Sequence, residues 1–105
     1  MPYFLCKLSP APSLDASARG VALAHQDYWL PYLNAGLVIV MGPVNDPAGA
    51  YGVMIAHAPS LKMLEDWQGK DPAILSGVHN YENHPMPTAR VAPTEPLAPV
   101  SSISP

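Results

Sequence analysis

A short run of purely apolar residues, bounded by two glycines, constrains the fold of this chain more than any other feature. Residues 37–41 read Leu-Val-Ile-Val-Met, which is typical of a β-strand that lies centrally in a sheet and is covered on both faces. A Gly-Pro pair ends this strand, and residues 45–49 are dense in turn-forming side chains. Residues 51–57 read as another strand, so the two strands are predicted to form a hairpin.

The segments before this hairpin indicate one strand followed by one long helix. Residues 3–8 alternate in the manner of a strand. Ser13 is a good N-cap and Asp15 favours the first turn of a helix, which is expected to end just before Gly36. Pro31 predicts a kink or a break in this helix, because proline lacks the N–H that a helix interior needs.

The segments after the hairpin indicate two short helical stretches and a last strand. Ser60 is expected to cap a second helix that stops at Gly69, and Asp71 to cap a further helical turn. Residues 79–84 read as a fourth strand. The order β-α-β-β-α-β predicts an α+β, ferredoxin-like fold with a four-stranded antiparallel sheet and both helices on one face. The other sheet face needs a cover, and a second subunit is the simplest one.

Composition narrows the class of protein. The chain has 105 residues, enough for one folded domain, here expected over residues 1–86 and followed by a proline-rich tail, 87–105. Only 12% of the residues are charged and the net charge is −3, so nucleic-acid binding through charge neutralisation is not expected. No apolar run is long enough to span a membrane, and no signal peptide is visible, so a cytoplasmic homodimer is expected.

His25 is the first candidate for chemistry. It shares one stripe of the long helix with Tyr28, Trp29 and Tyr32, and therefore faces the core or a cavity within it. Two interpretations remain open at this point. His25 is either an interior histidine that bonds a carbonyl, or a general acid or base, since its ordinary pKa lies close to neutral pH.

Other polar residues allow both a structural and a functional interpretation. Asp46, in the loop after the Gly-Pro pair, either forms a turn or orients a histidine. Asp71 is most simply a helix cap. His57, His79 and His84 lack the spacing of metal ligands and are interpreted as ordinary strand or surface residues, so neither a metal nor a cofactor is expected.

Several short pieces of the sequence occur in a fixed order. They are the opening YFL, His25 with Tyr28-Trp29 and Leu33, Gly36, Gly42-Pro43, Asp46-Pro47-Ala48-Gly49-Ala50, Asp71-Pro72 and the closing YENHPM. Taken in order, these pieces resemble the YCII-related (YciI-like) family over roughly residues 2–86. The resemblance implies a dimeric α+β barrel with a small-molecule pocket and an active site built on a His–Asp pair. His25 matches the helix histidine, and Asp46 is chosen as its partner; the rival position holds Asn34, which could not act as a carboxylate.

The function expected from these observations is that of a small enzyme without a cofactor, of lyase or isomerase type. His25 would move a proton on a cyclic substrate while Asp46 orients and charge-balances it. One alternative is a non-catalytic dimer that binds a metabolite or regulates a partner, and another is haem or monooxygenase chemistry, as in wider relatives of the family. The residues expected to bind the substrate are Tyr28, Trp29, Tyr32, Gly42 and Pro43.

Overall fold

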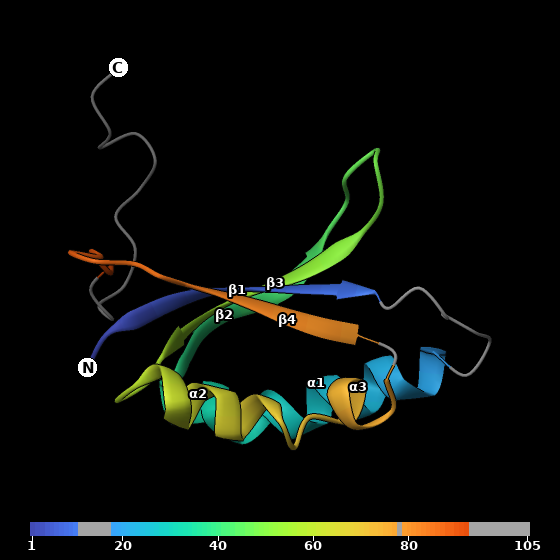
Figure 1. The fold of residues 1–105 in the computed structure, drawn as a ribbon, viewed down its shortest axis with the longest axis horizontal. Coiled ribbons are helices and arrows are strands. Elements are labelled where there is room, and N and C mark those ends of the chain that lie inside the picture. The colour runs from blue at the N-terminus through green and yellow to red at the C-terminus, as the bar shows by residue number, and fades with distance from the viewer. Residues whose placement is uncertain (11–17, 78, 93–105) are drawn as a thin grey trace.

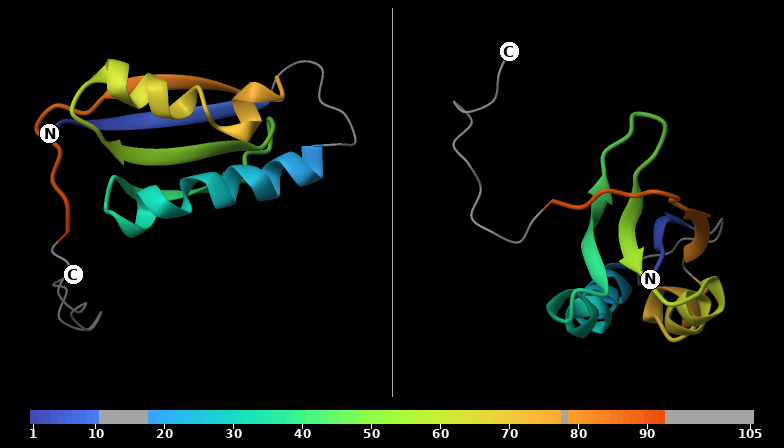
Figure 2. Two further views of the ribbon diagram at one scale, coloured as in Figure 1. Left: turned by 90° about the horizontal axis from the view of Figure 1, so that it is seen from below. Right: turned by 90° about the vertical axis from the view of Figure 1, so that its left-hand side faces the viewer.

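The computed structural model describes residues 1–10, 18–77 and 79–92. A four-stranded antiparallel sheet carries its helices on one face (Figure 1). A view from the helix side shows α1 running beside α2 and α3 beneath the strands (Figure 2). The elements are β1 (Tyr3–Pro10), α1 (Ala18–Asn34), β2 (Val38–Val44), β3 (Tyr51–His57), α2 (Leu61–Gln68), α3 (Pro72–Leu75) and β4 (His79–Pro85).

The strand order β2-β3-β1-β4 confirms the predicted ferredoxin-like α+β fold. β1 lies in the middle and pairs antiparallel with β3 on one side and β4 on the other. The predicted central position of β2 is wrong, because β2 is an edge strand. Its apolar run has another cause: a bulge between Val38 and Val40 turns Val38 into the core and leaves Val40 55% exposed on the other face.

The C-terminal end of α1 forms as expected, whereas Pro31 does not break the helix. Gly36 has φ 76°, its N–H donates to the Leu33 carbonyl at 3.1 Å, and the next N–H, that of Leu37, donates to Tyr32 at 2.9 Å. The helix continues through Pro31 to Asn34. Pro31 lies on the exposed side of α1, where water can replace the hydrogen bond that proline removes.

Two of the predicted caps are confirmed, while the start of the first helix cannot be compared. Ser60 Oγ accepts the N–H of Met63 at 3.1 Å and so begins α2. Asp71 begins α3 through the N–H of Ala73, with a proline at the first helical position. The expected caps near residues 13 and 15, and the proline-rich tail beyond residue 92, lie outside the described residues.

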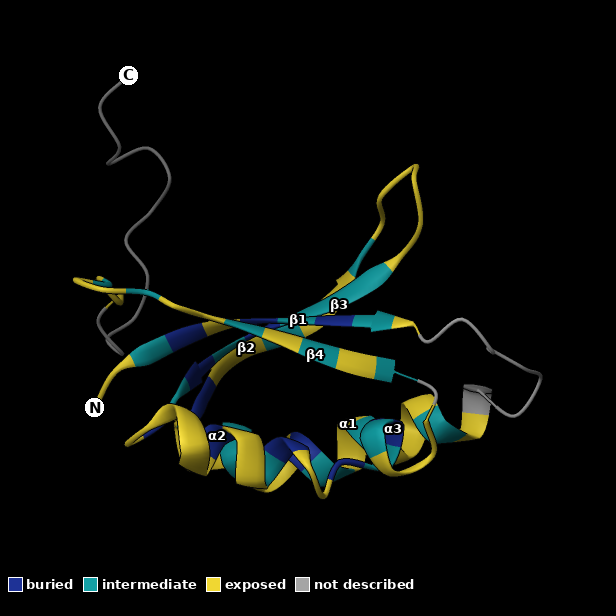
Figure 3. Ribbon diagram, in the orientation of Figure 1, coloured by how far each residue is buried: buried dark blue, intermediate teal, exposed yellow. Residues whose placement is uncertain are grey.

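The core lies between the sheet and the helices, and burial is concentrated on the inner sides of both layers (Figure 3). α2 is fixed to β4 by a reciprocal pair of amide hydrogen bonds, each 2.7 Å long, between Gln68 and Asn83. None of the helices in the described ranges is both long and apolar enough to cross a membrane. The largest fully buried side chains are Trp29, Leu64, Val38, Asp71 and Cys6.

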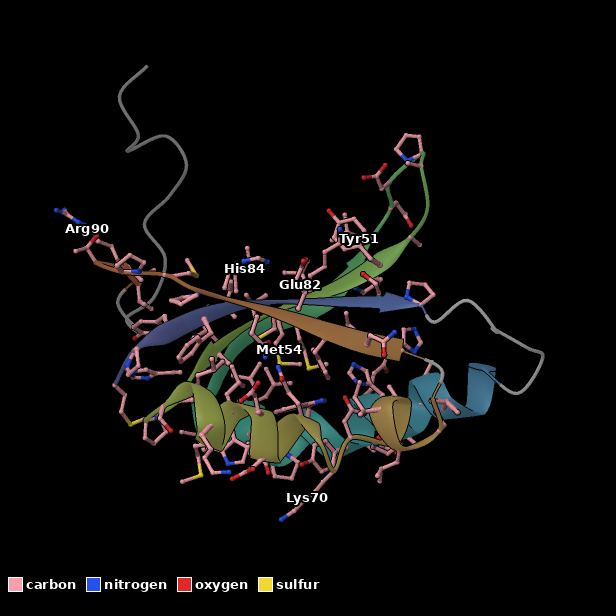
Figure 4. All side chains as sticks on the ribbon, in the orientation of Figure 1. Tyr51, Met54, Lys70, Glu82, His84 and Arg90 are labelled. Atoms are coloured by element: carbon pink, nitrogen blue, oxygen red, sulfur yellow. The ribbon has the colours of Figure 1, made fainter. Side chains whose placement is uncertain are left out.

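The opposite face of the sheet has no cover within the described part of the chain. Leu5 of β1, Ile55 of β3 and Val40 of β2 lie next to one another across three strands of this face. Figure 4 shows His84 and Glu82 on the same side of the sheet, away from the helices, while Met54 points between sheet and helices. The face is therefore apolar over its middle and polar along β4.

Candidate active site

A cavity of about 620 Å³ lies between α1 and the sheet, which is the usual size of a small-molecule site. Apolar side chains form much of its wall, among them Leu8, Leu33, Met41 and Met54. Gly42 and Pro43, two of the residues predicted to bind a substrate, also line it. Its polar lining residues include His25, His79 and Tyr81.

His25 is held in place by Asp71. Its Nδ1 lies 2.6 Å from Asp71 Oδ2, and the Asp71 side chain is fully buried. A carboxylate can only accept, so Nδ1 carries the hydrogen and donates it. The other ring nitrogen, Nε2, has no hydrogen-bond partner within the described part of the chain, so it is the nitrogen available to a ligand.

The Asp71 carboxylate accepts hydrogen bonds from residues of three different elements. Besides His25 of α1, its Oδ2 accepts the indole N–H of Trp29 at 2.8 Å and the hydroxyl of Tyr81 at 2.6 Å. Its Oδ1 accepts the Ala73 N–H at 2.9 Å and caps α3. Four donors satisfy the buried carboxylate, which would otherwise be costly to remove from water.

The hydrogen bonds to Asp71 also set its protonation. Burial raises the pKa of Asp71, but the hydrogen bonds from His25, Tyr81, Trp29 and Ala73 together outweigh burial and hold this pKa below its usual value. The carboxylate is therefore ionised at neutral pH. A histidine next to such a carboxylate keeps one tautomer, and its ring is charge-balanced when it takes up a proton.

Asp46, the aspartate chosen from the sequence, does not lie in this position. Its Oδ1 accepts the N–H of Ala48 at 2.9 Å, which is the turn-forming role. The physical reason is the direction of the β2–β3 loop, which projects away from the helices (Figure 1). The expected hydrogen bond between His25 and Asp46 is therefore corrected to one between His25 and Asp71. The rival Asn34 lies nine residues further along α1, about 13 Å from His25 along the helix axis.

The three aromatic residues predicted to stack on a substrate are not among the described residues that line the cavity. Trp29 is fully buried in the core, with its ring centroid 4.9 Å from that of Tyr32. Tyr28 donates its hydroxyl to the backbone carbonyl of Trp67 at 2.6 Å. Trp29 therefore helps to position Asp71, to which it donates its indole N–H, while the rings of Tyr28 and Tyr32 pack against Trp29.

Sequence reasoning missed three residues of the site: Asp71 as the partner of His25, together with Tyr81 and His79. The sequence held a signal for Asp71, because a capping aspartate uses one carboxylate oxygen for the cap and leaves the other free to accept a hydrogen bond from another residue. No local pattern distinguishes Tyr81 or His79. Within the described ranges, no group of three or more His, Cys, Asp or Glu side chains is arranged to hold a metal ion, and a reaction without a cofactor stays a prediction.

Comparisons with known proteins agree with this architecture. The model of the YCII-related domain matches residues 1–86. One similar solved structure is 5-chloro-2-hydroxyhydroquinone dehydrochlorinase (TftG) from Burkholderia phenoliruptrix AC1100, in complex with 2,5-dihydroxybenzoquinone. It superposes with a TM-score of 0.62 at 22% identity, covering 78% of this chain and 90% of the other, and so supports the fold. No curated protein matches the chain.

Proposed function

Since the chain belongs to the YCII-related family, we propose that it is a small-molecule enzyme in which His25 and Asp71 perform acid–base chemistry on a ring substrate. The observation that carries this proposal is the 2.6 Å contact between His25 Nδ1 and Asp71 Oδ2 at the wall of a 620 Å³ cavity. Its reaction would be that of a lyase or an isomerase.

The proton would move through Nε2 of His25, because Nδ1 is occupied by Asp71. Nε2 takes a proton from the ligand, and the electron pair left behind forms a new double bond. In a lyase reaction a leaving group departs from the neighbouring atom, and in an isomerase reaction the proton returns to a different atom. A positioned group of this kind contributes roughly 10²–10⁴-fold to the rate.

Hydroxylated, quinone-like six-membered rings are the proposed substrate class. TftG, which shares the fold, acts on a chlorinated hydroxyhydroquinone and was captured with a dihydroxybenzoquinone. The cavity described above suits such rings, because its apolar wall fits a ring face and its polar side chains can meet ring oxygens.

The test combines binding with turnover. 2,5-Dihydroxybenzoquinone serves as the binding probe in calorimetry, and 5-chloro-2-hydroxyhydroquinone as a substrate whose chloride release is followed. His25→Asn should lower turnover by roughly 10²-fold or more while the probe still binds. His84→Asn is the matched control, because His84 is exposed and its Nε2 lies 3.4 Å from Glu82 on the opposite face of the sheet.

Three results would count against the proposal. Equal turnover by wild type and His25→Asn would remove His25 from the chemistry. Probe binding without turnover of any ring compound would favour the non-catalytic, metabolite-binding alternative. Failure of the wild type to bind the probe would exclude this substrate class.

We also propose that a second copy of the chain covers the open sheet face. Leu5, Val40 and Ile55 form a continuous apolar patch there, which water would otherwise contact. Sedimentation should show a dimer, and Ile55→Lys should convert it to a monomer. A monomeric wild type would contradict this proposal without affecting the proposed chemistry.

A further inference from the structure

His79 is the polar residue of the cavity that the chemistry proposed above does not use. It begins β4 and lies two positions before Tyr81, so both side chains point toward the helices. Its Nδ1 is buried and has no hydrogen-bond partner among the described residues. A buried nitrogen without a partner costs free energy, so its presence beside an open cavity needs an explanation.

The surroundings of His79 keep its ring uncharged. Burial is the main cause that lowers the pKa of His79, the charge of His25 lowers it further, and the charge of Asp71 partly opposes both. Tyr81 on β4, with Asp27 on α1 and Tyr51 on β3, are the other described titratable groups that line the same cavity. A neutral imidazole in this position has one nitrogen lone pair to offer.

We propose that His79 contacts the ligand and accepts the hydrogen bond of a ring hydroxyl. The inference rests on the proposed function, because it uses the same cavity and the same class of ring. The hydroxyl keeps its proton, because the lowered pKa of His79 disfavours a charged ring. The ligand then lies between two histidines, and His25 carries out the proton movement proposed above.

The charges around the cavity favour a hydroxyl over a strongly anionic group. Among the described residues that line it there is no lysine or arginine, and Asp27 is present. A phosphate or a dicarboxylate would find no fixed cation among these described residues. A ring hydroxyl is uncharged and needs only an acceptor, which the neutral ring of His79 offers.

The test uses 4-nitrophenol, at a pH low enough to keep it neutral, and 4-nitroanisole, which has no hydroxyl hydrogen to donate. Wild type should bind the phenol more tightly than the anisole. His79→Phe should weaken phenol binding about tenfold, as expected for one lost hydrogen bond. Its affinity for the anisole should stay unchanged, and the exposed control His84→Phe should behave as wild type.

His79→Gln keeps a side chain that can accept a hydrogen bond, so it should retain part of the affinity for the phenol. It also provides a second variant if His79→Phe does not fold by circular dichroism. Unchanged phenol binding in both variants would overturn the inference, as would a wild type that does not distinguish the two probes. Neither result affects the proposed function, which depends on the His25→Asn turnover measurement.

Discussion

Replacing Asp71 by asparagine tests the hydrogen-bond arrangement on which the site depends. The side chain keeps its size, but one acceptor oxygen becomes an NH₂ donor and the charge is lost. If the NH₂ faces His25, Trp29 and Tyr81, it meets three donors. If it faces Ala73, the cap of α3 is lost instead. Asp71→Asn therefore leaves at least one buried donor unsatisfied in either orientation.

The less costly orientation keeps the oxygen on the three side chains. It loses the cap, worth about 1 kcal/mol, and weakens three charge-assisted hydrogen bonds, together worth about 2 kcal/mol. The free energy of unfolding should fall by roughly 3 kcal/mol at neutral pH. For a domain of this size that corresponds to a drop in Tm of about 15 °C.

Urea unfolding followed by tryptophan fluorescence, repeated at several pH values, measures this effect. The pKa of Asp71 in the folded protein lies below its ordinary value of about 4, so its stabilisation is present above that pH and is lost as the pH falls further. The difference in free energy of unfolding between wild type and Asp71→Asn should be constant near neutral pH and should become smaller in acid. Asp66→Asn is the matched control, because the Asp66 side chain is exposed and its Oδ1 lies 3.7 Å from Lys62 Nζ, an exposed ion pair of little weight. A loss below about 0.5 kcal/mol, or a gap independent of pH, would refute the reasoning.

Three further predictions follow from single residues. Cys6 is fully buried, and burial raises the pKa of its thiol to about 12, although a hydrogen bond from Gln68 lowers it in part. The Cys6 thiol should therefore react with Ellman's reagent only after unfolding, and fast reaction in the native protein would contradict its burial. Ser60→Ala should lower the free energy of unfolding by about 1 kcal/mol and leave probe binding unchanged, because it removes only the cap at the start of α2. An unchanged Tm would show that this cap does not stabilise the protein. Because the pKa of His79 is lowered in the folded chain, its ring takes up a proton more readily in the unfolded chain. The free energy of unfolding of the wild type should therefore fall as the pH drops below about 6.5, and that of His79→Phe should fall less. An equal dependence of this free energy on pH in the two proteins would contradict the prediction.

Much of the fold was predictable because its signals are local. The turn-rich loop between β2 and β3, the glycine after α1, and the caps at Ser60 and Asp71 each depend on a few neighbouring residues. The position of β2 in the sheet depends instead on which strands lie beside it. An apolar run predicts a strand with two apolar faces, but it does not tell whether both faces are covered. In β2 one face packs on helices and the other remains open, an arrangement that the bulge at Val38 allows.

The site was predictable only in part, for the same reason. His25 could be found because a helix stripe is a local pattern. Asp46 and Asp71 both stand in turn-forming Asp-Pro contexts, and nothing nearby distinguishes them. The difference arises when α3 packs against α1 and brings a free carboxylate oxygen to His25, a contact across 46 positions of the chain. The aromatic stripe predicts a ligand surface, whereas in the structure its rings pack on one another and Trp29 donates a hydrogen bond to Asp71.

The place of β1 in the sheet has a consequence for how the protein is made. β1, the first strand of this sheet in chain order, pairs on one side with β3 and on the other with β4, the last strand of the sheet. Its edge toward β4 stays unpaired until about residue 85 has emerged from the ribosome, and Tyr81, which contacts Asp71, arrives only then. Non-local pairing of this kind slows folding. We expect the pocket to form only after β4 has emerged, and chains stalled before β4 to depend on chaperones, because β1 then exposes an unpaired strand edge.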